Sequence, residues 1–127
     1  MSGANVEIVR RLYDEFNVTL ELPPWALRED VEWQPPADEP DNGLRRGADA
    51  VNAYVREWAS TFDDYGCDVH ELIDRGDSVV ASLHLHGRIR DSGVPLSLPL
   101  TQVWTIRDGT VIQVHEYRTT AEALEAH

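Results

Sequence analysis

Two histidines, His84 and His86, stand two residues apart within the segment 78–90. Apolar and polar residues alternate through this segment, and such alternation is typical of a β-strand with two different faces. On such a strand the two imidazoles share one face, about 7 Å apart. Because imidazole titrates near neutral pH, the pair suits proton transfer or the binding of polar groups. It is also consistent with a polar face exposed to water, or with histidines that only satisfy hydrogen bonds.

The two faces of this strand differ in character. One face is apolar and consists of Val79, Ala81, Leu83 and Leu85. The other face consists of Val80, Ser82, His84, His86 and Arg88. Burying polar side chains costs free energy unless their polar atoms are bonded, so two histidines are a costly choice for a face that serves only as core. The polar face is therefore where we look for function.

The segment 78–90 belongs to an expected antiparallel meander. Its strands cover residues 67–73, 78–90, 95–106 and 110–118. Gly93 and Gly109 end the turns between the last three strands. Glycine supplies the positive φ that tight hairpins require, so these pairings are antiparallel. Strands of about a dozen residues exceed the usual length, which predicts a strongly bent sheet.

Apolar residues at helical spacing predict helices in the first half of the chain. The expected helices begin at Asn5, cover 25–29 and 48–65, and end the chain at 119–126. Gly66 would stop the third helix, and Thr119 with Glu122 matches a capping box for the last. A strand at 31–33 and a loop at 34–47 lie between the second and third. We expect an α+β domain in which three helices cover the concave face of a bent sheet and enclose a cavity.

Composition narrows the possible functions. The 127 residues fit a single domain, 1–127, and the net charge of −12 disfavours nucleic acid and anionic membranes as partners. All 11 basic residues are arginine, which excludes lysine Schiff-base chemistry and suggests a GC-rich bacterial genome. Cys67 has no cysteine to pair with. Because no apolar run reaches the roughly 20 residues of a membrane span and no signal peptide is apparent, we expect a cytoplasmic protein.

The order of elements and several short motifs resemble the nuclear transport factor two-like superfamily, and within it the SnoaL-like group. The motifs are Val9–Phe16, Asp30–Trp33, Gly47–Val51, Ser92–Val94, Val103–Gly109, Glu116–Tyr117 and Ala121–Ala126. The resemblance covers roughly residues 5–126 and implies a cone-shaped α+β fold with a cavity. Its members include ketosteroid isomerase, polyketide cyclases, epoxide hydrolases, a dehydrochlorinase, and proteins that only bind or assemble.

The resemblance also indicates which reactions of the family to expect in this chain. Ketosteroid isomerase combines a general-base aspartate with an oxyanion hole made by a tyrosine and a protonated aspartate. Tyr13 matches the tyrosine on the first helix, but the base would fall at or beside Trp33 and the protonated aspartate near Gln102. The aspartate of the SnoaL-type cyclases is missing from the Gln102 region as well. Neither reaction is expected here in its known form.

By the same resemblance, the polar face of segment 78–90 points into the cavity. We expect His84 to be the acid–base centre, Glu116 to set its charge, and Tyr13 to donate to a substrate oxygen. The expected ligand-binding residues are Trp33, Trp58, Phe62, Ser82, His86, Arg88, Gln102 and Trp104. The chain has four tryptophans, and an aromatic cavity suits a flat apolar ligand.

A metal site is the alternative hypothesis for the same residues. His84 and His86 with the Glu116 carboxylate would supply three ligands, and His115 is a possible substitute. His115 and Glu116 are adjacent on one strand, so they point to opposite faces and only one can join. The following glutamate and histidine of cupin-type spacing are absent. We expect neither a metal nor a cofactor.

We therefore predict a protein that binds a small apolar organic molecule. If it is an enzyme, we expect cofactor-free acid–base chemistry, such as isomerisation, cyclisation, dehydration or epoxide opening. The alternative is a non-catalytic ligand-binding or assembly module. If the helices cover the polar side of segment 78–90, its apolar face stays uncovered. Uncovered apolar faces usually meet a partner, and symmetric pairs are the commonest solution, so we also expect a homodimer.

Overall fold

The computed structural model describes residues 2–127 and shows three α-helices, one 3₁₀ turn and a six-stranded sheet. In chain order the elements are α1 (Ser2–Thr19), η1 (Pro24–Ala26), β1 (Leu27–Gln34), β2 (Arg45–Arg46), α2 (Ala48–Ser60), β3 (Phe62–Asp74), β4 (Ser78–Ile89), β5 (Pro95–Arg107), β6 (Thr110–Tyr117) and α3 (Thr120–Ala126). The expected order of helices followed by strands is confirmed.

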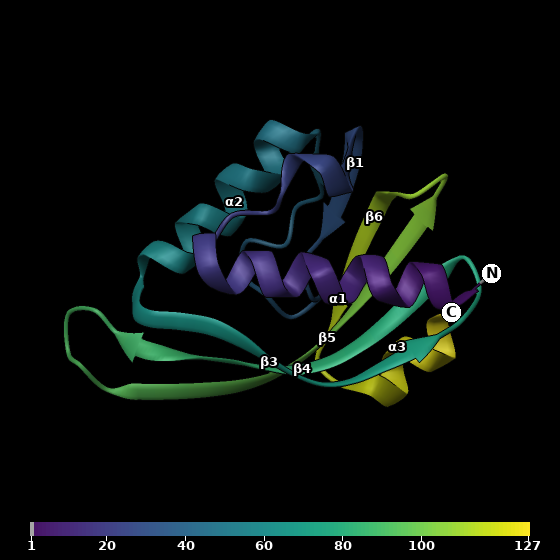
Figure 1. Cartoon of the computed structure of the whole chain (residues 1–127). Coiled ribbons are helices and arrows are strands. Elements are labelled where there is room, and N and C mark those ends of the chain that lie inside the picture. Colours follow the sequence, from purple (N-terminus) through teal and green to yellow (C-terminus); the bar gives the residue numbers. More distant parts are fainter. Residues whose placement is uncertain (1) are drawn as a thin grey trace.

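The strands form one mixed sheet in the order β2-β1-β6-β5-β4-β3. Every neighbouring pair is antiparallel except β1 and β6, which run parallel. The long strands bend across the molecule, with α1 and α2 on one side of the sheet and α3 on the other (Figure 1). The predicted fold class, an α+β cone with a bent and mostly antiparallel sheet, is confirmed.

The main core lies between the helices and the inner sheet face. Val9, Leu12 and Phe16 recur at spacings of three and four on α1, and all three are buried. Val51 and Val55 do the same on α2. Burying one such apolar stripe per helix contributes roughly 1.5–3 kcal/mol for each large side chain, which is what fixes the helices on the sheet.

The sheet faces are the reverse of the expectation. Ala81 pairs directly with Gln102, and Val79 pairs with Trp104, so the apolar set of β4 shares the inner face with these residues. Directly paired residues point to the same side of a sheet. Val79, Ala81 and Leu83 lie in the main core beneath the helices. The prediction that the polar face of 78–90 looks into the cavity is wrong, because removing apolar surface from water decides which face is covered.

The final helix, α3, covers part of the outer face. Its Ala123 packs with Val80 and Val103, which point away from the main core. The predicted capping box is confirmed: the Thr119 hydroxyl accepts from the Glu122 backbone, and the Glu122 side chain accepts from the Thr119 backbone. Because the apolar face of β4 is covered by helices, the reasoning that led to a homodimer loses its premise. The dimer itself stays a prediction.

Three helix boundaries differ from the expectation. The first helix, α1, begins at Ser2 and not at Asn5. The second helical segment is only the 3₁₀ turn η1, and strand β1 already begins at Leu27. The third helix, α2, ends at Ser60, so Gly66 lies within β3. The pairing of β3 with β4 shifts register between Asp63 and Gly66, and a Cβ at Gly66 would come within 2.8 Å of His86 Nε2. This glycine therefore permits close strand contact and does not stop a helix.

None of the helices in residues 2–127 combines the length and the hydropathy that a membrane span requires.

Candidate functional site

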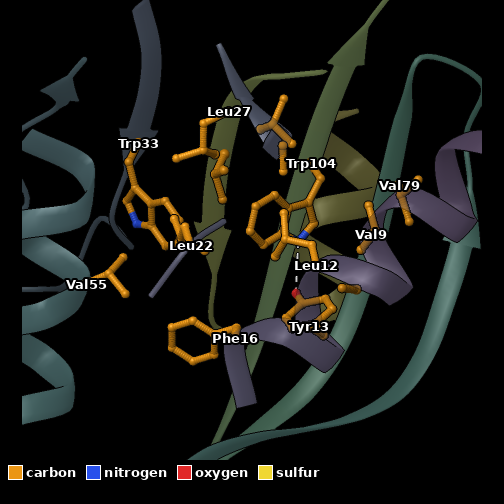
Figure 2. Packing of buried hydrophobic residues seen from close by; sticks show 14 of the residues in the cluster. Val9, Leu12, Tyr13, Phe16, Leu22, Leu27, Trp33, Val55, Val79 and Trp104 are labelled. Atoms are coloured by element: carbon orange, nitrogen blue, oxygen red, sulfur yellow. Dashed lines mark hydrogen bonds between the residues drawn. The ribbon is translucent and has the colours of Figure 1, made fainter. Parts of the chain in front are cut away.

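A cavity of about 60 Å³ lies between α1, α2 and the inner face of the sheet. Seven aromatic side chains contribute to its lining: Tyr13, Phe16, Trp33, Tyr54, Trp58, Tyr65 and Trp104. Figure 2 shows how Trp33 from β1, Trp104 from β5 and Tyr13 from α1 converge on this region. The charged side chains that line the cavity are those of Glu39, Glu116 and Arg118.

Glu116 is the buried acid of this site. It lies on β6, lines the cavity and is only 6% exposed. Trp33 Nε1 donates to its Oε1 at 2.9 Å, and Gln102 Nε2 donates to its Oε2 at 2.9 Å. Both partners lie on strands that flank β6, because β6 sits between β1 and β5 in the sheet. The Glu116 carboxylate therefore receives one hydrogen bond from each neighbouring strand.

The hydrogen-bond network extends from Gln102 to the first helix. Tyr13 donates its hydroxyl proton to Gln102 Oε1 at 2.5 Å, and Trp104 Nε1 donates to the Tyr13 oxygen at 2.8 Å. The dashed line in Figure 2 marks the second of these bonds. The bonds run in one direction: Trp104 donates to Tyr13, Tyr13 donates to Gln102, and Gln102 donates to Glu116. Such an oriented network stabilises negative charge on the carboxylate.

Burial and hydrogen bonding act on Glu116 in opposite directions. Burial raises the pKa of its carboxyl above the ordinary 4.5, and the bonds from Gln102 and Trp33 lower the pKa again. The Arg118 charge lowers the pKa further, whereas the Glu39 charge raises it, and the net shift is upward. Burial also raises the pKa of the Tyr13 hydroxyl well above 10, so Tyr13 stays protonated as a donor. Glu116 is thus a stronger base than an exposed glutamate.

A loop between β1 and β2, residues 35–44, covers one side of the cavity through Pro36 and Glu39. Arg118, just after β6, ties this covering loop to the sheet. Its Nε donates to Asp38 at 2.9 Å and its Nη2 donates to Glu39 at 2.8 Å. The guanidinium is therefore paired with loop carboxylates, and the nitrogen donors bonded to Glu116 are neutral.

Tyr54 brings a further hydroxyl to the cavity. It lies on α2, its ring centroid is 6.2 Å from that of Trp33, and its oxygen accepts from Trp58 Nε1 at 3.1 Å. No acceptor for the Tyr54 hydroxyl proton is found among residues 2–127. Burial raises its pKa to about 12, and the Glu116 charge contributes in the same direction. The group therefore remains a hydrogen-bond donor beside the cavity.

The structure brings together six of the eleven residues proposed from the sequence. Those that line the cavity are Tyr13, Trp33, Trp58, Gln102, Trp104 and Glu116. Phe62 is buried beside the cavity, stacked on Trp58 and Tyr65 at centroid distances of 6.1 and 5.2 Å. The four polar residues of β4, which are Ser82, His84, His86 and Arg88, do not line it. Sequence reasoning missed Tyr54, although it stands four residues before Trp58 on the same helix face.

The β4 histidines make their contacts on the outer face. His84 Nδ1 hydrogen-bonds with His70 Nε2, and His86 Nε2 lies 3.5 Å from the Asp68 carboxylate. Because His84 pairs with Pro99 while Ala81 pairs with Gln102, His84 lies across the sheet from Glu116. The expectation that His84 sits beside Glu116 and Gln102 is wrong. The alternative ligand set of His84, His86 and Glu116 is split between the two faces for the same reason.

Within residues 2–127, no group of three or more histidine, cysteine or carboxylate side chains is arranged to hold a metal ion.

Cys67 lines the cavity as well, but burial raises the pKa of its thiol to about 12. A thiol with so high a pKa carries little thiolate and is a poor nucleophile. Proton transfer by Glu116 is therefore the chemistry that this set of side chains supports.

Comparison with known proteins places the chain in a family. The model of the SnoaL-like domain matches residues 9–114. A candidate SnoaL-like polyketide cyclase from Jannaschia sp. CCS1 is 22% identical, with a TM-score of 0.78 over 98% of this chain and 91% of that one. An NTF2-like protein of unknown function from Burkholderia pseudomallei is 23% identical, with a TM-score of 0.74 over 96% and 95%.

TerC, co-crystallised with polyporic acid, is 21% identical, with a TM-score of 0.73 over 96% of each chain. At these identities the likeness to the solved structures shows a shared fold and does not extend to their activities. No curated protein matches the chain. The match to the SnoaL-like model covers most of the sequence and includes both Tyr13 and Gln102. With the bent sheet and its cavity, this match shows that the chain belongs to the SnoaL-like domain family.

Proposed function

We propose that this chain binds a small organic molecule in the cavity and that Glu116 exchanges a proton with it. The observation that carries the proposal is a carboxylate 6% exposed, set in an aromatic cavity and bonded by two neutral nitrogen donors. A carboxylate has about four acceptor positions, so two of them remain for a ligand. Its raised pKa makes it a better general base near neutral pH.

The reaction class that fits is proton abstraction next to a carbonyl group. Glu116 takes a proton from the carbon, the C–H electron pair forms a C=C bond, and the carbonyl oxygen becomes negative. Tyr54 is placed to donate its hydroxyl proton in a hydrogen bond to that oxygen. Glu116 then returns the proton to the same carbon or to another one. The outcome is exchange or isomerisation, and no cofactor takes part in these steps.

Tyr13 and Gln102 act as positioning residues in this proposal. The Tyr13 proton is already donated to Gln102, so it is not available to a substrate oxygen. Gln102 in turn fixes the orientation of the Glu116 carboxylate. Trp33, Trp58 and Trp104 keep their predicted role as cavity residues. Glu116 takes over the proton transfer predicted for His84, in place of its own predicted role of setting the charge of His84.

Cavity size points to a compact ligand. About 60 Å³ lies well below the roughly 300–1,000 Å³ of pockets for drug-sized molecules. A larger, flat ligand would need Trp58 to move, since it stacks against Phe62 at the cavity's edge. The co-crystal of TerC with polyporic acid supports an organic ligand for this fold.

Deuterium uptake by a small ketone tests the proposal. Acetone in D₂O, followed by proton NMR, should exchange its α-protons faster with the wild-type protein than in buffer. Glu116→Gln should lower the protein-dependent rate by about 100-fold or more, as expected for loss of a general base. Tyr54→Phe should lower it by about tenfold or more. Glu125→Gln, which changes an exposed acid on α3, is the matched control and should retain the rate. Equal rates for Glu116→Gln and wild type would reject proton transfer by Glu116.

A non-catalytic binding or assembly module is the second candidate. The parallel stack of Trp58, Phe62 and Tyr65, with interplanar angles of 11° and 16°, favours it because these rings occupy space that a ligand would need. In that case the wild-type protein and Glu116→Gln would both leave acetone exchange at the buffer rate.

A further inference from the structure

The buried carboxylate in the cavity lining, that of Glu116, lacks a cationic partner in its hydrogen bonds. Both oxygens of Glu116 receive neutral N–H donors, from Trp33 and Gln102. The cavity's guanidinium, Arg118, directs its bonds to Asp38 and Glu39 on the covering loop. Two carboxylates and one guanidinium therefore leave an excess of negative charge in the cavity lining.

A buried charge without a directly bonded counter-charge is costly, because the low-dielectric surroundings do not replace its hydration. A neutral apolar ligand would remove the remaining water from Glu116 and increase this cost. A ligand that carries a positive charge would instead supply the missing counter-charge. The excess negative charge of the cavity lining therefore favours a cationic ligand over a neutral one.

The rings around Glu116 favour the same kind of ligand. Aromatic faces attract cations, and a group of several rings binds quaternary ammonium ions especially well. Trp33, Tyr54 and Trp104 lie together at ring-centroid distances of 6.2 and 5.9 Å. Tyr54 already makes one such cation–ring contact within the protein, since the Arg45 guanidinium lies 4.3 Å from its ring centroid.

We infer that the ligand of this cavity carries a compact organic cation, such as a methylated ammonium group, that sits between Glu116 and the surrounding aromatic rings. The inference rests on the proposed function in taking this cavity as the ligand site. The small cavity fits a compact head group, whose methyl surface suits the apolar lining. The two roles of Glu116 are compatible, because a cation fixed beside the carboxylate brings the neighbouring C–H bonds of the ligand within its reach.

Choline and its neutral isostere 3,3-dimethylbutan-1-ol form the test pair, because they share one shape and differ in charge. Isothermal titration calorimetry at pH 7.5 should show choline binding at least tenfold tighter than the neutral alcohol. Glu116→Gln should weaken choline binding at least tenfold and leave the alcohol within threefold. Glu57→Gln, an exposed acid on α2, serves as the matched control and should change neither affinity.

The salt dependence of binding distinguishes a ligand in the cavity from non-specific attraction to the surface of a chain with net charge −12. Binding in a buried site should change less than threefold between 50 and 300 mM NaCl, whereas attraction to the surface is screened strongly over this range. A steep loss with salt would overturn the inference.

The remaining outcomes separate the two proposals. Tighter binding of the neutral alcohol, or equal binding of both, would overturn the cationic ligand while the organic-ligand cavity stands. If neither compound binds, the cationic ligand is rejected. The acetone exchange experiment then decides separately whether Glu116 still transfers protons.

Discussion

Gln102 on β5 and Glu116 on β6 are a direct cross-strand pair, joined by a bond of 2.9 Å from the Gln102 amide to the Glu116 carboxylate. Both side chains are 6% exposed. Two polar groups buried together in this way are stable only because further donors complete the network, with Trp33 on one side and Tyr13 on the other. The pair is the structural basis of the predictions that follow.

Tyr13→Phe should destabilise the fold by about 2–4 kcal/mol, because it leaves the Trp104 N–H and the Gln102 oxygen buried without their partner. Urea unfolding measures the effect. Tyr117→Phe is the control, since its hydroxyl bonds the exposed His127. Similar losses for the two variants would show that the buried network adds no stability of its own.

Trp33→Phe should raise the pKa of Glu116 further. The indole N–H bonds the charged carboxylate and thereby lowers its pKa, and phenylalanine keeps an aromatic ring but no donor. Carbon-13 NMR of the glutamate side-chain carboxyl carbons, assigned by comparison with Glu116→Gln, follows the titration. Trp25→Phe, at an indole that bonds Glu15, is the matched control. A lower pKa in Trp33→Phe would contradict the proposed effect of the bond.

The contribution of Glu116 to stability should decrease as the pH rises. Its folded pKa lies above the ordinary 4.5, so between 4.5 and the raised value the folded state binds more protons than the unfolded state. The Glu116 contribution to the free energy of unfolding is therefore fully present below 4.5 and decreases with pH through this window.

Glu116→Gln removes this contribution and leaves every other group in place. The difference in unfolding free energy, wild type minus Glu116→Gln, followed from pH 4.5 to pH 8, should therefore decline as the pH rises above 4.5. Urea unfolding of both proteins across that range measures it. A difference that rises with pH would mean that the carboxylate is stabilised on folding and that its pKa is lowered.

His84→Ala should retain the protein-dependent acetone exchange within about twofold. The imidazole bonds His70 on the outer face and is separated from Glu116 by the sheet. The NMR assay proposed for Glu116→Gln applies unchanged. A loss comparable to that of Glu116→Gln would restore His84 as the acid–base centre and refute the assignment made from the sheet faces.

Arg118→Gln should loosen the covering loop, because it removes the ion pairs to Asp38 and Glu39. Amide hydrogen exchange in residues 36–42 should become faster, while β4 and β5 keep their protection. Arg46→Gln is the control, since Arg46 pairs with Glu32 on β1 and makes no bond to this loop. Unchanged exchange in residues 36–42 would show that other contacts hold the loop.

Local sequence patterns determined much of the fold. Alternation and glycine turns identified the strands of the meander, and Gly93 and Gly109 both adopt the expected positive φ. The capping box at Thr119 marked the start of α3. These features depend on residues close together in the chain, which is why they could be predicted without a structure. The family motifs then gave the fold class, because their order reflects the whole domain.

Tertiary structure decided which face of the sheet holds the site. Alternation in β4 shows that two faces exist, but it does not say which one the helices cover. Packing of α1 and α2 buried the apolar face, and this placed Gln102 and Glu116 inside and His84 outside. Bonds in the Glu116 network join residues up to 91 positions apart, as from Tyr13 on α1 to Trp104 on β5. No local pattern contains such contacts, so only the folded chain could reveal Glu116 as the centre of the site and Tyr54 beside it.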